Sequence, residues 1–311
     1  LFKRNPSETA SSTGRLVARL EKVNYCFSSS IYGFPVAALD DWERKILIGI
    51  LWSSLARYFL FLVSSGWGVY HGEVLQTELM TLPIRFPMSS TLRNRIVQIV
   101  DRLMDWDYAD AKALQAARLG DELASLEKQL DGAIFDLYDL TQAERELIQD
   151  LCSVGFELLY RKTAKSATAR VREYPEDTYG TIDSLSSPRS GDVSLQNYLR
   201  TFLQIWNREL EPNGEFAWHV IRAKHAPMIA VVFATQEKGE ATQKVFYEDE
   251  SDWNEILKRC SIVLRQPVSE RIYIDGMIRA VTDTEIIIVK RDERRLWTRS
   301  MAREDADAAI V

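Results

Sequence analysis

Histidines and motif glycines are the first places to look for chemistry in this 311-residue sequence. The three histidines, His71, His219 and His225, are not at ligand spacing, and no cysteine or acidic pair accompanies them, so the sequence does not predict a zinc site. The phosphate-cradling motifs GxGxxG and GxxxxGKS/T are absent, as is the GxSxG motif of serine hydrolases. Nucleotide binding of those types and serine hydrolysis are therefore not indicated.

Asp275, Glu285 and Lys290 lie on two expected hairpin strands and raise the possibility of a metal-dependent nuclease. Such an enzyme needs acidic residues on adjacent strands with a lysine nearby. Glu285 and Lys290 are five residues apart, however, and would point to opposite faces of one strand. Charged residues flanking a solvent-exposed hairpin are the simpler interpretation. Metal-dependent DNA cleavage that is lost in Asp275→Ala would favour the nuclease.

A polar and aromatic connection follows the most apolar segment of the chain. It contains Ser64, Ser65, Trp67, Tyr70 and His71. Hydroxyls can donate to phosphates, aromatic rings can stack on bases, and a loop held by a rigid helix is a common place for recognition. The alternative is that Trp67 packs over the helix end and the neighbouring glycines only form a turn.

Helices are expected to position this connection. Acidic residues at 40–41 predict the start of a helix over residues 42–63, because carboxylates accept hydrogen bonds from the first turn. Two short strands around the serine turn at residues 28–30 precede it. Further helices are predicted at residues 91–104, at 110–138 and from residue 141, the last two as an antiparallel helical hairpin.

The composition changes in the second half of the chain. Residues 161–192 are basic and then rich in Pro, Gly and Ser, which is typical of a linker, so residues 1–160 and 193–311 are predicted to be separate domains. The predicted fold class is α+β: a mainly helical first domain with a small β element, and a second domain of helices with a mainly antiparallel sheet. Its expected helices are 195–210, 251–262 and 301–310, and its expected strands are 216–224, 228–235, 243–248, 271–281, 285–291 and 295–298. The continuous apolar run at 228–235 suits the centre of the sheet.

Composition restricts the functional classes. The formal net charge of −6 argues against nucleic-acid binding over the whole surface, so any such face must be local. Cys26, Cys152 and Cys260 are too dispersed for a disulfide framework, which favours a reducing, cytoplasmic setting. Residues 46–63 form the longest apolar run, but Arg57 lies near its middle, so a buried helix is expected and no membrane partner.

Two ordered segments carry a family resemblance. Residues 46–68, ILIGILWSSLARYFLFLVSSGWG, followed by ELMTLPI at 78–84, resemble the region downstream of the catalytic domain in N6-adenine DNA methyltransferases of restriction-modification type. There a helix precedes an LPI-like turn within or beside the target-recognition part. LDGAIFDLYDLTQAE at 130–144 is similar to the stretch that follows in the same enzymes. The resemblance covers residues 25–160, suggests a type IIG-like or phage-defence enzyme, and does not reach residues 193–311.

The resemblance also shows what the sequence lacks. The family's catalytic half needs a glycine-containing S-adenosylmethionine loop and an Asn/Asp-Pro-Pro-Tyr/Phe motif that holds the flipped adenine, and neither occurs here. The chain is therefore not expected to methylate DNA by itself on that mechanism, and we expect no catalytic residue for it and no cofactor in this chain. The first residue is not Met, and we expect the catalytic domain, with its S-adenosylmethionine, either upstream in the same polypeptide or on another subunit.

The function expected from these features is to hold double-stranded DNA and select its sequence for a methyltransferase domain. Local cations would contact phosphates, and the serine turn with the 64–71 connection would contact bases. The predicted DNA-contacting residues are Arg15, Arg19, Ser29, Ser30, Ser64, Ser65, Trp67, Tyr70, His71, Arg161, Lys162 and Lys165. A solvated hinge is the alternative for the basic residues at 161–165.

A protein–protein assembly role is the rival hypothesis. Residues 121–157 contain ten carboxylates against one lysine and one arginine, so the helical hairpin should face away from DNA. It could instead dock other subunits of a multi-subunit defence complex, together with residues 193–311. Salt-dependent retention of DNA would favour the recognition role, and co-purification of a partner without DNA would favour assembly.

Overall fold

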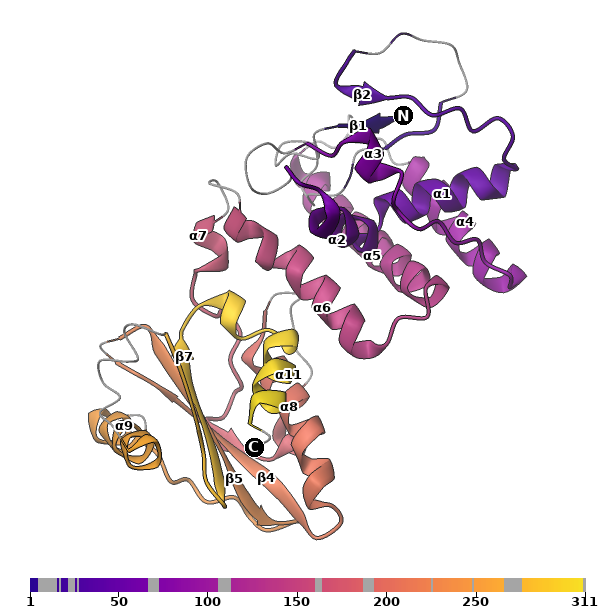
Figure 1. The fold of residues 1–311 in the computed structure, drawn as a ribbon. Coiled ribbons are helices and arrows are strands. Elements are labelled where there is room, and N and C mark those ends of the chain that lie inside the picture. The colour runs from indigo at the N-terminus through magenta and orange to yellow at the C-terminus, as the bar shows by residue number, and fades with distance from the viewer. Residues whose placement is uncertain are drawn as a thin grey trace. The chain divides into compact units, whose positions relative to one another are not determined.

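The protein folds as two compact α+β units, residues Leu1–Tyr160 and Arg161–Val311, in a computed structural model (Figure 1). The structure describes residues 1–4, 16, 18–21, 26, 28–66, 73–105, 113–159, 164–186, 193–224, 226–247, 249–265 and 276–309. Each unit has its own hydrophobic core, so each is considered separately below.

The first unit is mainly helical. Its elements are β1 (Phe2–Lys3), β2 (Ile31–Tyr32), α1 (Asp41–Trp52), α2 (Ser54–Val63), α3 (Gln76–Leu79), α4 (Ser90–Met104), α5 (Ala113–Leu137), α6 (Gln142–Ser153) and the 3-10 helix η2 (Gly155–Leu159). Helix α4 packs against α1 and α5, and their apolar faces bury Ile46, Ile50, Ile96, Val100 and Leu130 in one core. Strand β2 pairs antiparallel with β1, from the very start of the chain.

The predicted single helix over residues 42–63 is wrong, because the chain bends by 63° between α1 and α2. The Ser53 hydroxyl accepts a hydrogen bond from Ala56 N–H, which caps α2. The buried Asp131 accepts from the backbone N–H of Ser54 at 2.8 Å and from its hydroxyl at 2.7 Å. Two serines and a distant carboxylate thus end one helix and start the next.

Arg57, which argued against a membrane span, lies inside the protein on α2. Its guanidinium is 4.6 Å from the centre of the Phe156 ring and donates to the Cys152 carbonyl at 3.2 Å. Within the described ranges no single helix has the length and apolar character to cross a membrane, and only the bent pair of α1 and α2 passes on length and composition.

The two helices of the predicted helical hairpin, α5 and α6, each have their main packing partner elsewhere in the unit. Helix α6 packs mainly against α2, while α5 packs against α4. The turn between α5 and α6 contains Asp139 in a left-handed conformation with φ of 56°. The capping box predicted at Thr141 and Glu144 is confirmed: the Thr141 hydroxyl accepts from Glu144 N–H, and the Glu144 carboxylate accepts from Thr141 N–H.

The second unit is a five-stranded antiparallel sheet with helices on both faces. Its elements are α7 (Ala164–Ala167), β3 (Tyr179–Gly180), η3 (Ile182–Ser184), α8 (Leu195–Leu210), β4 (Gly214–Arg222), β5 (Met228–Glu237), α9 (Glu250–Leu264), β6 (Met277–Val281), β7 (Glu285–Arg291), η4 (Arg294–Leu296) and α11 (Arg299–Ala308). The strand order is β3-β4-β5-β7-β6. Figure 1 shows α9 on one side of the sheet and α8 with α11 on the other.

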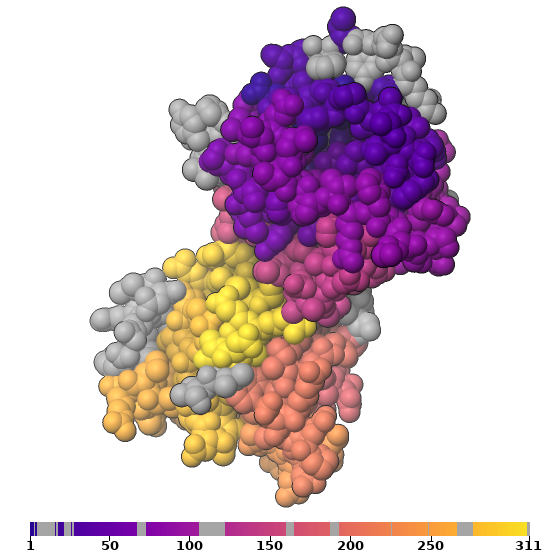
Figure 2. Space-filling view, turned by 45° about the vertical axis from the view of Figure 1, so that its right-hand side comes forward, coloured from indigo at the N-terminus to yellow at the C-terminus, as the bar shows by residue number. Residues whose placement is uncertain are grey.

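The central position predicted for residues 228–235 is confirmed, because β5 is the middle strand. Its residues alternate between two cores: Val231 faces α8 and α11, and Val232 faces α9. Helices α8 and α11 pack on each other over the core that contains Val231, and the salmon surface of α8 lies beside the yellow surface of α11 in Figure 2. Residues 164–186, which fall in the expected linker, belong to this unit and contribute β3 and the buried Val171 and Leu185.

Two predicted strands of this unit are wrong. Residues 243–247 have no strand, although Phe246 is buried against the α9 face. The strand predicted at 295–298 is replaced by the 3-10 helix η4 at 294–296, and Trp297 follows it into the core against α8. In both places the apolar residues are buried against helices. The apolar pattern therefore predicted burial correctly but not the strand.

Candidate functional site

Arg4 joins the serine turn, one of the segments predicted to contact DNA, to residues 73–74, which follow another. Its guanidinium donates to the Ser29 carbonyl at 2.9 Å and to the Glu73 carboxylate at 3.3 Å. Its backbone N–H donates to Ser30, and its carbonyl accepts from Val74 N–H. We refer to Arg4, Ser29, Ser30, Glu73 and Val74 as the Arg4 junction. It brings the serine turn together with the residues that follow the 64–71 connection.

Local structure explains why Arg4 occupies this position. Phe2 is buried in the core and Lys3 pairs with Ile31, so the chain leaves β1 beside the serine turn. The Arg4 guanidinium lies 5.3 Å from the centre of the Tyr32 ring, within cation–π distance. The side chain is therefore held by a ring, a carbonyl and a carboxylate from different parts of the chain.

Glu78 on α3 binds Ser65, in the 64–71 connection, and Leu75, which follows it. Its carboxylate accepts from the backbone N–H and hydroxyl of Ser65 at 2.8 and 2.9 Å, and from Leu75 N–H at 2.8 Å. Burial opposes ionisation of this carboxyl, but the hydrogen bonds from Ser65 and Leu75 outweigh it and lower the pKa of Glu78. The end of α2 and the start of α3 are thus tied to one ionised side chain.

Of the predicted DNA contacts in the first unit, three are exposed near the Arg4 junction. Arg19 exchanges backbone hydrogen bonds with Leu1, next to β1, and its side chain is 78% exposed while pairing with Glu21 at 2.7 Å. Ser29 and Ser30 are exposed in the turn. The other predicted DNA-contacting residues either lie elsewhere in the described part of the chain or fall outside the described residues.

Ser64 and Ser65, at the end of α2, have contacts within the unit. Ser64 is buried, and the Ser65 hydroxyl is used by Glu78. Lys165 is exposed on α7 of the second unit. The other predicted contacts, Arg15, Trp67, Tyr70, His71, Arg161 and Lys162, lie outside the described residues.

The acidic stretch at 121–157 is not an uncompensated surface. Asp136 pairs with Arg95 and Arg145, at 2.9 and 2.8 Å. Other pairs are Arg85 with Asp139 and Arg102 with Glu122. Arginines of α4 and its neighbours therefore pair with three of the ten carboxylates that were expected to face a partner.

A buried charge cluster occupies the α11 face of the second unit. The fully buried Asp305 accepts from the Tyr198 hydroxyl at 2.6 Å, from Arg279 Nε at 2.8 Å and from the Lys290 ammonium. Burial and the Asp305 charge raise the pKa of Tyr198 well above its usual value, so this hydroxyl stays protonated and donates. Burial lowers the pKa of Lys290, and the ion pair with Asp305 opposes that shift.

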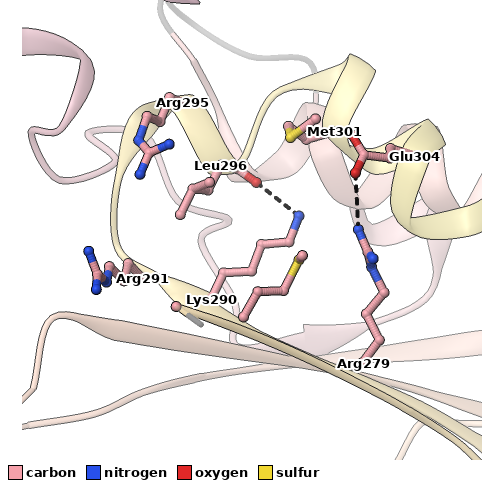
Figure 3. Close-up of a pocket in the computed structure, with 9 residues that line it drawn as sticks. Arg279, Lys290, Arg291, Arg295, Leu296, Met301 and Glu304 are labelled. Carbon is pink, nitrogen blue, oxygen red and sulfur yellow. Dashed lines mark hydrogen bonds and ion pairs between the residues drawn. The ribbon is translucent and has the colours of Figure 1, made fainter. Parts of the chain in front are cut away.

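An open pocket of about 340 Å³ lies beside this cluster (Figure 3). Its polar lining is Arg279, Lys290, Arg291, Arg295 and Glu304, and its apolar lining is Met277, Leu296 and Met301, with Gly276. Lys290 Nζ also donates to the Leu296 carbonyl at 3.2 Å. Four cations thus converge on one pocket of a chain whose net charge is negative.

The nuclease alternative loses its geometric basis for two of its three residues. Glu285 pairs with Arg259 of α9, whereas Lys290 pairs with Asp305 of α11, so the two side chains lie on opposite faces of β7 as predicted. Asp275 lies outside the described residues. In the part of the chain that the structure describes, no three His, Cys, Asp or Glu side chains group closely enough to hold a metal ion.

His219 has an apolar environment on β4. Its ring stacks on Tyr179 with centroids 5.9 Å apart and meets Phe246 edge-on. Burial, assisted by the charge of Arg259, lowers the pKa of His219 to about 4. This histidine is therefore a neutral core residue near pH 7.

Sequence reasoning missed Arg4, Glu78 and Asp305. Each bonds to residues distant in the chain, and no local pattern marks such a residue. The convergence of Lys290, Arg291 and Arg295 had a visible signal in the basic run at residues 290–295, KRDERR, which ends the last strand. Comparison with protein-family models, with curated proteins and with solved structures gave no match to this chain.

Proposed function

We propose that this chain is the DNA-binding, target-recognition part of an adenine-specific DNA methyltransferase of a restriction-modification or phage-defence system. The proposal rests first on the ordered resemblance of residues 46–84 and 130–144 to those enzymes. Its main structural support is the Arg4 junction, because it gathers the serine turn and the residues that follow the 64–71 connection within one unit.

Rigid attachment of the connection is what a reading loop requires. Sequence-selective contact needs side chains presented from a fixed scaffold, since ordering a free loop on DNA costs conformational entropy. Arg4 and Glu78 supply that fixation through hydrogen bonds to both flanks of the connection. Ser29 and Ser30 are exposed in the turn that Arg4 holds.

Phosphate contact would come from local cations. Arg19 has an exposed side chain beside β1, and its pairing with Glu21 is a surface ion pair that DNA phosphate can replace at small cost. Each phosphate contact releases counterions, so binding should weaken steeply with salt. Methyl transfer would be performed by a catalytic domain carrying S-adenosylmethionine, in cis or in trans, since this sequence lacks that domain's motifs.

A salt titration of DNA binding tests the proposal. Labelled duplexes are mixed with the full chain from 50 to 200 mM salt, and the slope of log affinity against log salt is measured. Arg19→Gln should reduce the slope by about one and weaken all sequences alike. Arg102 is an exposed arginine outside the predicted contacts and pairs with Glu122. Arg102→Gln should therefore leave the slope unchanged.

A protein assembly module remains the second candidate. Exposed large apolar side chains favour it: Leu62 of α2 is 60% exposed, Met80 after α3 is 68% exposed, and Met88 is fully exposed. If the full chain retains no duplex at 50 mM salt but co-purifies with a subunit of a defence complex, the assembly role is supported and the recognition role is refuted.

A further inference from the structure

Lys290 is a buried amine at the wall of an open pocket. Its side chain is only 1% exposed, and it lines the pocket of about 340 Å³ together with residues of β6, η4 and α11. Figure 3 shows the Lys290 nitrogen directed away from β7, toward the Leu296 carbonyl and below Met301. The pocket volume lies within the roughly 300–1,000 Å³ typical of small-molecule sites. The pocket therefore gives a small molecule a route to an amine that is shielded from bulk water.

A proton acceptor is in direct contact with this amine. Asp305 is fully buried, and its Oδ2 atom accepts a hydrogen bond from the Lys290 ammonium. The Tyr198 hydroxyl and Arg279 Nε hold the carboxylate in place, from 2.6 and 2.8 Å. Asp305 is thus positioned to take a proton from the ammonium and to return it.

Desolvation makes this lysine a better nucleophile than a lysine on the surface. Burial lowers the pKa of Lys290, and the nearby Asp305 charge opposes that shift without cancelling it. An exposed lysine, with a pKa of about 10.4, is almost entirely protonated at neutral pH and attacks carbonyl groups poorly. Desolvated lysines in apolar pockets are the ones that form Schiff bases with carbonyl compounds.

One side of the pocket is apolar and indicates which carbonyl compounds it suits. Met277, Leu296 and Met301 form this side, and methionine adapts to ligands of different shape. We propose that Lys290 forms an imine with an apolar aldehyde bound in this pocket. The carbonyl carbon meets Lys290 Nζ, and the body of the aldehyde packs against the three apolar side chains. This proposal concerns the second unit alone and does not depend on DNA binding by the first.

The reaction balances without an oxidant or a reductant. Asp305 takes one proton from the Lys290 ammonium, and the neutral amine attacks the carbonyl carbon and forms the C–N bond. The carbonyl oxygen receives a proton from the attacking nitrogen, which gives a carbinolamine. Asp305 then returns its proton to the hydroxyl group, which leaves as water while the C=N bond forms. The iminium ion keeps the positive charge of the ammonium, so the buried Asp305 retains its counterion.

Reductive trapping on the full chain tests the proposal. The folded chain is incubated with benzaldehyde and cyanoborohydride at pH 7, and the labelled lysines are identified by mass spectrometry of its peptides. Lys290 should be labelled at least about ten-fold faster than Lys258, an exposed lysine of α9 outside the pocket. Because the site is mapped in the wild-type chain, the result does not require a Lys290 variant that folds. The proposal is overturned if the folded chain gains no label at Lys290, or if Lys290 is labelled only after unfolding in urea.

A matched pair of variants tests the apolar side of the pocket. Met301→Gln places a polar side chain of similar length there, and it should slow benzaldehyde labelling of Lys290 several-fold. Labelling by formaldehyde, which has no apolar body, should stay as in the wild-type chain. Met80→Gln changes an exposed methionine of the first unit and should leave both reactions unchanged. Equal benzaldehyde labelling of Lys290 in Met301→Gln and in the wild-type chain would overturn the assignment of an apolar aldehyde.

Discussion

Replacement of Asp305 by asparagine should destabilise the second unit strongly. The native carboxylate is fully buried and accepts hydrogen bonds from Tyr198, Arg279 and Lys290. Asparagine keeps the shape but removes the charge, which leaves the ammonium of Lys290, only 1% exposed, without its counterion. Loss of one partner of a buried ion pair costs about 3–5 kcal/mol. That is a large share of the roughly 5–15 kcal/mol by which domains are stable.

Urea unfolding of the full chain, followed by hydrogen exchange of peptides from β7, measures this loss within the second unit. Glu304→Gln is the matched control, because its pair with Arg279 at 3.4 Å is 58% exposed on the glutamate side and should be worth at most about 1 kcal/mol. Adding Lys290→Met to Asp305→Asn should recover part of the stability, since the unpaired buried charge is removed.

The reasoning about this cluster would be refuted by either of two results. One is an Asp305→Asn chain as stable as the Glu304→Gln chain. The other is a double variant no more stable than Asp305→Asn alone, because that would show that the uncompensated Lys290 charge is not the source of the loss.

Three further predictions follow from individual side chains. His219, with a pKa of about 4 when folded and about 6.5 when unfolded, should make the second unit lose stability as pH falls through that window, by about 3 kcal/mol at most; His219→Phe should flatten this loss in urea titrations at pH 7 and 4.5. The lowered pKa of Glu78 gives stability that is present above pH about 4.5 and lost below it. Glu78→Gln should therefore cost about 1–3 kcal/mol at pH 7 and less at pH 4, seen as faster exchange of the Ser65 amide. Ser53→Ala should cost about 0.5–2 kcal/mol through loss of the cap on Ala56 N–H, whereas Ser53→Thr should stay close to wild type in the same unfolding assay.

The elements that sequence reasoning located best are those specified by their own residues. Helix α8 and strand β7 have the predicted bounds, Leu195–Leu210 and Glu285–Arg291. In α8 the apolar residues recur at helical spacing and Ser194 caps the start, and in β7 an unbroken β-branched run follows a turn. Such signals are local, so no knowledge of the neighbours is needed to recognise them.

The errors arose where a distant residue decides the local structure. The bend after α1 depends on Asp131, which is 77 residues from Ser54, and no feature of residues 42–63 reveals that partner. The apolar residues at 243–248 resemble a strand, yet Phe246 is buried by α9 and by the His219 ring. The candidate sites follow the same logic, since Arg4 and Asp305 gain their roles from tertiary contacts, and Glu78 binds the distant Ser65 as well as the nearby Leu75.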